Sequence, residues 1–124
     1  MKPLLLFFVA TFALLLPSPQ AAAMEPAAQR EVDYLITYVG NSGYVFIRSG
    51  KEYSAAEGAA HLRMKLSRAG DRIKTADDFV AGVASKSYLS GGAYRVKTPE
   101  GKTFPTGPWL TEALAKHRKA KGGK

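Results

Sequence analysis

Residues 44–53 read YVFIRSGKEY, and residues 94–104 read YRVKTPEGKTF. The first stretch is rich in β-branched and aromatic residues, and Ser49-Gly50 in its middle is typical of a tight hairpin connection. The second stretch begins with alternating apolar and polar side chains, as a half-buried strand does. The chain then turns at residues 99–102 and returns as a short partner strand at residues 103–104. Because an isolated two-stranded ribbon is barely stable in water, we expect the two hairpins to pair into one small antiparallel sheet.

Segments with helical periodicity precede, separate and follow the two hairpins. Residues 25–39 place apolar side chains at i, i+3, i+4 and i+7, which is one face of a helix. Residues 54–69 open with the capping-box pattern SAAE, and residues 75–83 open with a weaker cap, TADD. A fourth apolar face follows Pro108, which suits a first helical turn. The sequence therefore predicts a single α+β domain, in which a small antiparallel sheet from two short hairpins packs against about four helices.

The first 23 residues have the features of a cleaved export signal. Lys2 supplies a positive start, residues 4–16 form an apolar run, and Ala21-Ala22-Ala23 offers the small side chains that a signal peptidase needs. The run is shorter than the roughly 20 residues of a spanning helix. We predict a signal peptide at 1–23 cleaved near Ala23, a single α+β domain at 24–118 and a basic flexible tail at 119–124. The expected location is periplasmic or secreted.

The chain has 18 basic and 10 acidic residues and no cysteine. We therefore expect no disulfide, and no transmembrane segment once the signal is removed. The basic excess is concentrated at the C-terminus. It has two possible interpretations: a solvated end, or an electrostatic contact with anionic polymers or a membrane surface. Nucleic acid is not an expected partner, because no aromatic residues interleave with these charges. The charges are Lys116, Arg118, Lys119, Lys121 and Lys124.

Several motifs follow one another in order between about Glu31 and Arg118. They are VFIRSG at 45–50, YSAAE at 53–57 with HL at 61–62, TADDFV at 75–80, ASKS at 84–87, SG at 90–91, Tyr94 and WL at 109–110. Together they resemble one bacterial family, the domain of unknown function 5329. The resemblance implies a small, signal-bearing, envelope-exported protein with no established activity, substrate or cofactor.

The resemblance also implies one proximity in the fold. Many relatives carry a cysteine where this chain has Tyr44 and another near Thr98. Since a disulfide needs Cα atoms about 4.4–6.8 Å apart, we predict that Tyr44 and Thr98 lie close together on neighbouring strands.

Five residues are candidates for a ligand-facing patch, if the fold brings them together: Arg48, His61, Lys65, Ser87 and Ser90. The guanidinium of Arg48 can bind a carboxylate or phosphate, or it can pair with Glu52 or Glu57. His61 either contacts a ligand or packs beside the buried stripe and bonds to a neighbouring carbonyl. The serines belong to a small, polar segment whose default role is a connector with local hydrogen bonds.

Motifs for metal binding and catalysis are weak. The two histidines, His61 and His117, have no ligand spacing around them, so no metal or other cofactor is expected. Asp77 and Asp78 are better explained as helix caps than as calcium ligands. A hydrolase with His61 as base and a serine from 85–90 as nucleophile remains an alternative, although no Gly-x-Ser-x-Gly elbow is present.

Our first functional hypothesis is therefore an uncharacterised exported periplasmic domain that acts as a non-enzymatic binding or structural protein of the cell envelope. Its partner would be an envelope protein or an anionic polymer. The alternatives are the small hydrolase and an inhibitor or immunity-type protein. The hydrolase requires a serine hydroxyl about 3 Å from the His61 imidazole, whereas a binding domain does not. Trp109, the sole tryptophan, is either a core anchor or a recognition platform.

Overall fold

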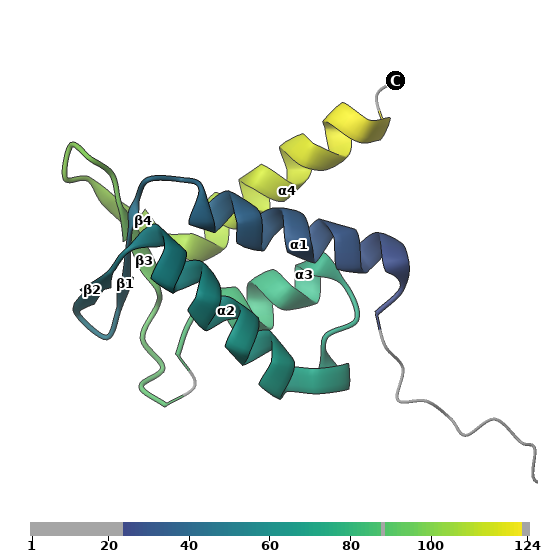
Figure 1. Ribbon diagram of the computed structural model, residues 1–124, viewed down its shortest axis with the longest axis horizontal. Coiled ribbons are helices and arrows are strands. Elements are labelled where there is room, and N and C mark those ends of the chain that lie inside the picture. Colours follow the sequence, from purple (N-terminus) through teal and green to yellow (C-terminus); the bar gives the residue numbers. More distant parts are fainter. Residues whose placement is uncertain (1–23, 88, 123–124) are drawn as a thin grey trace, which may run out of the picture.

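The computed structural model describes residues 24–87 and 89–122 (Figure 1), so the predicted signal peptide lies outside the described residues. These ranges contain four helices, four short strands and two short non-α helical turns. The helices are α1 (Pro26–Gly40), α2 (Ala55–Ala69), α3 (Ala76–Phe79) and α4 (Thr106–Gly122). The strands are β1 (Val45–Arg48), β2 (Lys51–Tyr53), β3 (Arg95–Lys97) and β4 (Thr103–Pro105). A 3₁₀ turn η2 (Gly70–Arg72) follows α2, and a π turn η3 (Val80–Ala84) follows α3.

The two hairpins form one antiparallel sheet with the strand order β2-β1-β3-β4, which confirms the predicted α+β fold. Ser49 and Gly50 both have positive φ angles, 52° and 78°, as the two-residue turn of a twisted hairpin requires. The central strands pair Val45 with Lys97. Tyr44 and Thr98 lie one residue beyond that pair, just outside the two strands, so the antiparallel register places them next to each other as predicted.

One face of the sheet packs against the helices. Phe46 of β1 pairs with Val96 of β3, and both are 1% exposed, whereas their strand neighbours are half-buried. Helix α2 approaches β1 at Gly58, where a Cβ atom would lie 2.6 Å from Cγ of Phe46. Figure 1 shows α1 and α2 lying side by side, with the strands gathered at one end of the molecule. The core therefore lies between the sheet and the helix layer.

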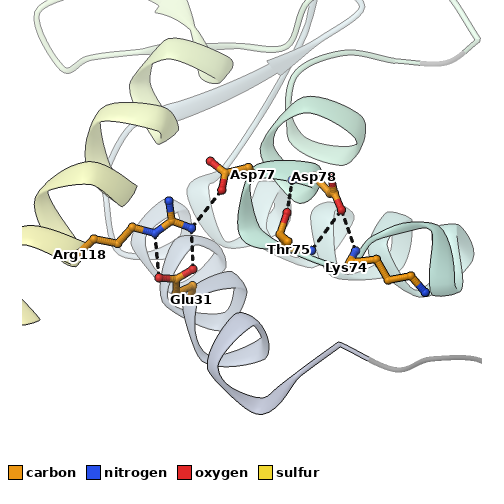
Figure 2. A network of polar contacts seen from close by, with 6 residues as sticks. All are labelled: Glu31, Lys74, Thr75, Asp77, Asp78 and Arg118. Carbon is orange, nitrogen blue, oxygen red and sulfur yellow. Dashed lines mark hydrogen bonds and ion pairs between the residues drawn. The ribbon is translucent and has the colours of Figure 1, made fainter. Parts of the chain in front are cut away.

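Both predicted caps are formed. The Glu57 amide donates to Ser54 Oγ at 3.0 Å, and the Ser54 amide donates to the Glu57 carboxylate at 2.8 Å. The same reciprocal pair joins Thr75 and Asp78 (Figure 2). The helix predicted at 75–83 is only partly α-helical, because η3 replaces its last turn, and Ser85 Oγ donates to the Val80 carbonyl there.

Helix α4 continues to Gly122, so residues 119–122 of the predicted flexible tail are helical; residues 123–124 lie outside the described part of the chain. Arg118 joins three helices (Figure 2). Its Nε and Nη2 donate to the two carboxylate oxygens of Glu31 in α1 at 2.9 and 2.8 Å, and Nη2 lies 3.1 Å from Oδ2 of Asp77 in α3. The hydrogen bonds from Arg118 lower the pKa of Glu31. Arg118 is therefore part of the folded domain.

In the described part of the chain, no helix combines the length and the apolar character needed to cross a membrane.

Candidate anion-binding groove

Two adjoining hollows of about 360 and 340 Å³ share Arg48, His61 and Met64, and together they form one groove along α2. We call this the basic groove, because the charged side chains that line its second hollow are all cationic. Apolar surface lies between the charges: Met64 is 44% exposed and Leu89 is 99% exposed. The second hollow is lined by Arg48, His61, Met64, Lys65, Arg68, Ala69, Arg72, Ser87, Leu89 and Tyr94.

Helical spacing explains why α2 supplies most of the groove. His61, Met64, Lys65 and Arg68 stand at i, i+3, i+4 and i+7, so they share one face of the helix. The neighbouring face of α2 is buried through Gly58, Leu62 and Ala69. The cationic face therefore lies along the edge of the core, with His61 and Lys65 partly buried and Met64 and Arg68 exposed.

A hydrogen-bonded chain closes the inner wall of the groove. The buried Tyr94 hydroxyl lies 3.1 Å from Nε2 of His61 and 3.0 Å from Nζ of Lys65. The Lys65 ammonium also donates to the carbonyls of Val83 at 2.8 Å and Lys86 at 2.6 Å. Lys65 thereby fastens α2 to the end of η3 and to the segment before β3.

Burial and nearby positive charge shift the ionisation of this wall. Burial, with a contribution from the charge of Arg48, lowers the pKa of Lys65 to about 8. Burial, followed by the charges of Arg48 and Lys65, lowers the pKa of His61. Both effects disfavour the charged forms. In the tautomer that carries its proton on Nδ1, a neutral His61 accepts a hydrogen bond from the Tyr94 hydroxyl at Nε2, while Lys65 donates to the oxygen of the same hydroxyl.

Four of the five residues predicted for the patch line this groove: Arg48, His61, Lys65 and Ser87. Ser90 is exposed and does not line it. The Ser90 amide donates to Ser87 Oγ at 3.3 Å, and Ser90 Oγ accepts from the Gly92 amide at 3.1 Å. These serines therefore form the local bonds of a connector.

Arg48 does not form the ion pair that we considered for it. Glu52 instead pairs with Lys97 at 2.6 Å, and Glu57 closes the cap of α2. The Arg48 guanidinium lies 5.4 Å above the ring of Tyr53 and 3.5 Å from its hydroxyl. Over residues 24–87 and 89–122, no carboxylate lies within ion-pair distance of Arg48, Arg68 or Arg72. Glu57 lines the first hollow, but its carboxylate is bonded to the Ser54 amide. Within the described residues the three guanidinium groups therefore face the groove without an ion-pair partner.

Arg68 and Arg72 were missed at the sequence level. The signal for both was available, since His61, Lys65, Arg68 and Arg72 repeat at i, i+4, i+7 and i+11. Leu89 and Tyr94 had no comparable signal, because they reach the groove from a segment far from α2 in sequence.

The groove does not contain the contact that a serine hydrolase needs. The hydrogen bond of His61 goes to Tyr94, and Ser85 Oγ donates to the Val80 carbonyl at 2.5 Å. In the described residues, no serine is hydrogen-bonded to His61. The same residues contain no group of three His, Cys, Asp or Glu side chains that could hold a metal ion.

The geometry thus defines the class of protein: a small α+β domain with a basic groove along its second helix. Residues 26–118 match the model of a family of unknown function, DUF5329, and the chain belongs to that family. It is 31% identical over 86 residues to an uncharacterized protein, YfeK, of Salmonella typhimurium strain LT2, with 68% of this chain and 72% of that protein covered. No solved structure is similar enough to the chain to count as a match.

Proposed function

We propose that this chain is a non-enzymatic binding domain that is exported to the cell envelope and holds an acidic partner in the basic groove. The observation that carries the proposal is the set of three arginines, Arg48, Arg68 and Arg72, which have no carboxylate partner within the described residues. Guanidinium groups bind carboxylates or phosphates in a fork geometry, and a charge-assisted bond is about twice as strong as a neutral one.

The apolar surface between the charges limits which class of partner fits the groove. Met64 and Leu89 are exposed beside the arginines, and a purely polar polymer would leave their surface in water. A segment that alternates acidic and apolar side chains satisfies both parts of the groove. We therefore favour an acidic segment of an envelope protein over an anionic polysaccharide.

A binding assay tests the groove. A fluorescently labelled peptide that alternates leucine and glutamate is titrated with the protein, and anisotropy is measured. We expect Arg68→Gln/Arg72→Gln to weaken binding more than tenfold, since each charge-assisted bond contributes about 1.5–3 kcal/mol. The matched control is Arg30→Gln/Lys119→Gln, which removes the same charge from exposed positions outside the groove.

The two double variants separate the groove from overall charge. If both weaken binding equally, the peptide follows net charge and the groove has no special role. A peptide with lysine in place of glutamate should not bind. If it binds as well as the acidic peptide, the proposed chemistry is wrong.

Export is tested separately. The signal-like features of residues 1–23 support it. When the chain is expressed with these residues in a bacterium, we expect it in the periplasmic fraction, with its mass reduced by the signal peptide. Full-length protein in the cytoplasm would contradict export and would leave the groove experiment unaffected.

The C-terminal end of α4 supports a weaker, additional attraction to anionic lipid. Lys116, Lys119 and Lys121 are exposed, whereas Arg118 is held by Glu31 and Asp77. We expect binding to phosphatidylglycerol vesicles to be salt-sensitive and to fall when residues 119–124 are deleted. Binding that does not change on deletion would show that the lysines are only a solvated end.

A further inference from the structure

A third hollow, of about 380 Å³, lies between α1, the start of β1 and the start of α4, and it shares no residue with the basic groove. The aromatic residues that line it are Tyr34, Tyr38, Tyr44 and Trp109, and the polar ones are Thr37, Asn41 and Ser42. We call it the aromatic hollow. None of these seven side chains carries a formal charge at neutral pH.

The aromatic rings form one continuous group. The ring centroids of Tyr38 and Trp109 are 5.2 Å apart, those of Tyr44 and Trp109 are 5.5 Å apart, and those of Tyr34 and Tyr38 are 6.0 Å apart. All four residues are only partly buried. Mutual packing holds the rings in fixed positions, so the ring surface that they leave open is rigid.

The polar groups of the hollow have hydrogen-bonding capacity to spare. Ser42 Oγ is occupied, because it donates to the Val39 carbonyl and accepts from the Tyr44 amide. Among the residues that the structure describes, by contrast, no hydrogen bond is formed by the side-chain amide of Asn41, the hydroxyl of Thr37 or the indole N–H of Trp109. Asn41 and Thr37 are exposed, one helical turn apart at the end of α1.

We propose that the aromatic hollow binds an uncharged saccharide. The C–H faces of a sugar ring pack on aromatic rings, and its hydroxyl groups can bond to the amide, hydroxyl and indole groups that line the hollow. A charged ligand finds no counter-charge there. A purely apolar ligand would bury the same polar groups without partners, which is unfavourable. The proposal is independent of the basic groove.

The sole tryptophan of the chain, Trp109, lies in the hollow, so its fluorescence reports directly on binding. The probes are N,N′,N″-triacetylchitotriose, maltotriose and cellotriose, each titrated to about 10 mM, which detects a dissociation constant as weak as about 1 mM. We expect a saturable change in intensity or emission maximum with at least one of them. Absence of a saturable change with all three would overturn the proposal.

Variants at the exposed polar positions give the second test. We expect Asn41→Ala to weaken binding about three- to tenfold, as the loss of one hydrogen bond does, and Thr37→Arg to abolish binding by filling the hollow. The matched control is Thr111→Arg, an exposed position of α4 that does not line the hollow. Circular dichroism spectra establish that each variant is folded.

These variants can also overturn the proposal. If folded Thr37→Arg and Asn41→Ala bind as the wild type does, the sugar is bound elsewhere and the inference is wrong. The variant Arg68→Gln/Arg72→Gln should keep full saccharide binding. If it loses that binding, the aromatic hollow is not an independent site.

Discussion

Substitution of Gly58 by alanine tests the contact that positions α2, and with it the basic groove, on the sheet. The added Cβ would lie 2.6 Å from Cγ and 2.7 Å from Cβ of Phe46, whereas carbon atoms in contact are about 3.5–4.0 Å apart. Phe46 is 1% exposed, and its ring centroid lies 5.3 Å from that of Tyr94, so it has little room to move. Helix α2 or strand β1 must therefore shift by about 1 Å.

Two opposing effects set the magnitude. Overpacking of a well-packed core costs about 1–3 kcal/mol, while replacement of glycine by alanine in a helix contributes about 0.8–1 kcal/mol of stability. We expect Gly58→Ala to lower the free energy of unfolding by about 1–2 kcal/mol, since the close atoms belong to a constrained ring. For a domain of this size the melting temperature then falls by about 5–10 °C.

Thermal and urea unfolding, followed by circular dichroism, measure this effect. The exposed position Ser67 on the same helix provides the control, because Ser67→Ala and Ser67→Gly compare alanine and glycine without a packing contact. A Phe46→Ala background removes Cγ and the ring and leaves only the Cβ contact at 2.7 Å, so the loss caused by Gly58→Ala should become smaller there. Two outcomes would refute the reasoning: Gly58→Ala at least as stable as wild type, or an equal loss in the Phe46→Ala background.

Three further predictions concern charged groups. The pKa of Lys65 is about 8 in the folded chain, whereas its ordinary value is 10.5, so the unfolded state binds more protons between these pH values. The free energy of unfolding of wild type relative to Lys65→Met, measured by urea titration, should therefore rise from pH 8 to pH 10.5. A constant difference would contradict the burial of the amine. Arg48→Gln should raise the pKa of His61, measured from imidazole proton shifts by NMR, because the charge of Arg48 lowers it; an unchanged titration would place the guanidinium farther away. Arg118→Gln should cost about 0.5–1 kcal/mol at low salt, as befits a pair with Arg118 42% exposed, and less at high salt; a loss that does not depend on salt would mean that packing, not charge, dominates.

Features predicted correctly from the sequence are those that depend on neighbouring residues. The hairpin turn at Ser49 and Gly50 and the cap of Ser54 and Glu57 each lie within a few positions, so composition and spacing are sufficient to find them. Helix α1 is predicted to within one residue at each end, because four apolar residues mark its buried face and Gly40 closes it.

Features that the sequence did not predict depend on distant segments. Arg118 and Glu31 are 87 positions apart, and no local pattern reveals that α4 crosses α1 there. The aromatic hollow joins Tyr38 in α1 to Trp109 in α4, so its residues are unremarkable until the helices are packed. Similarly, η3 replaces a helical turn where buried Thr106, from far along the chain, donates to the Ala84 carbonyl.

The contacts of Lys65 indicate which residues of the basic groove hold its shape and which are available to a ligand. Its ammonium donates to two carbonyls and to Tyr94, which is the full donor capacity of a lysine. A ligand carboxylate can therefore gain a bond from Lys65 only by displacing one that holds α2 in place. Arg48 and Arg72 each use one donor within the chain, on the Tyr53 hydroxyl and the Ala69 carbonyl. Since a guanidinium has five N–H donors, each keeps others for a ligand, and no carboxylate within the described residues pairs with these two or with Arg68. We therefore expect the arginines to contact an acidic partner directly, while Lys65 holds α2 in place beside them.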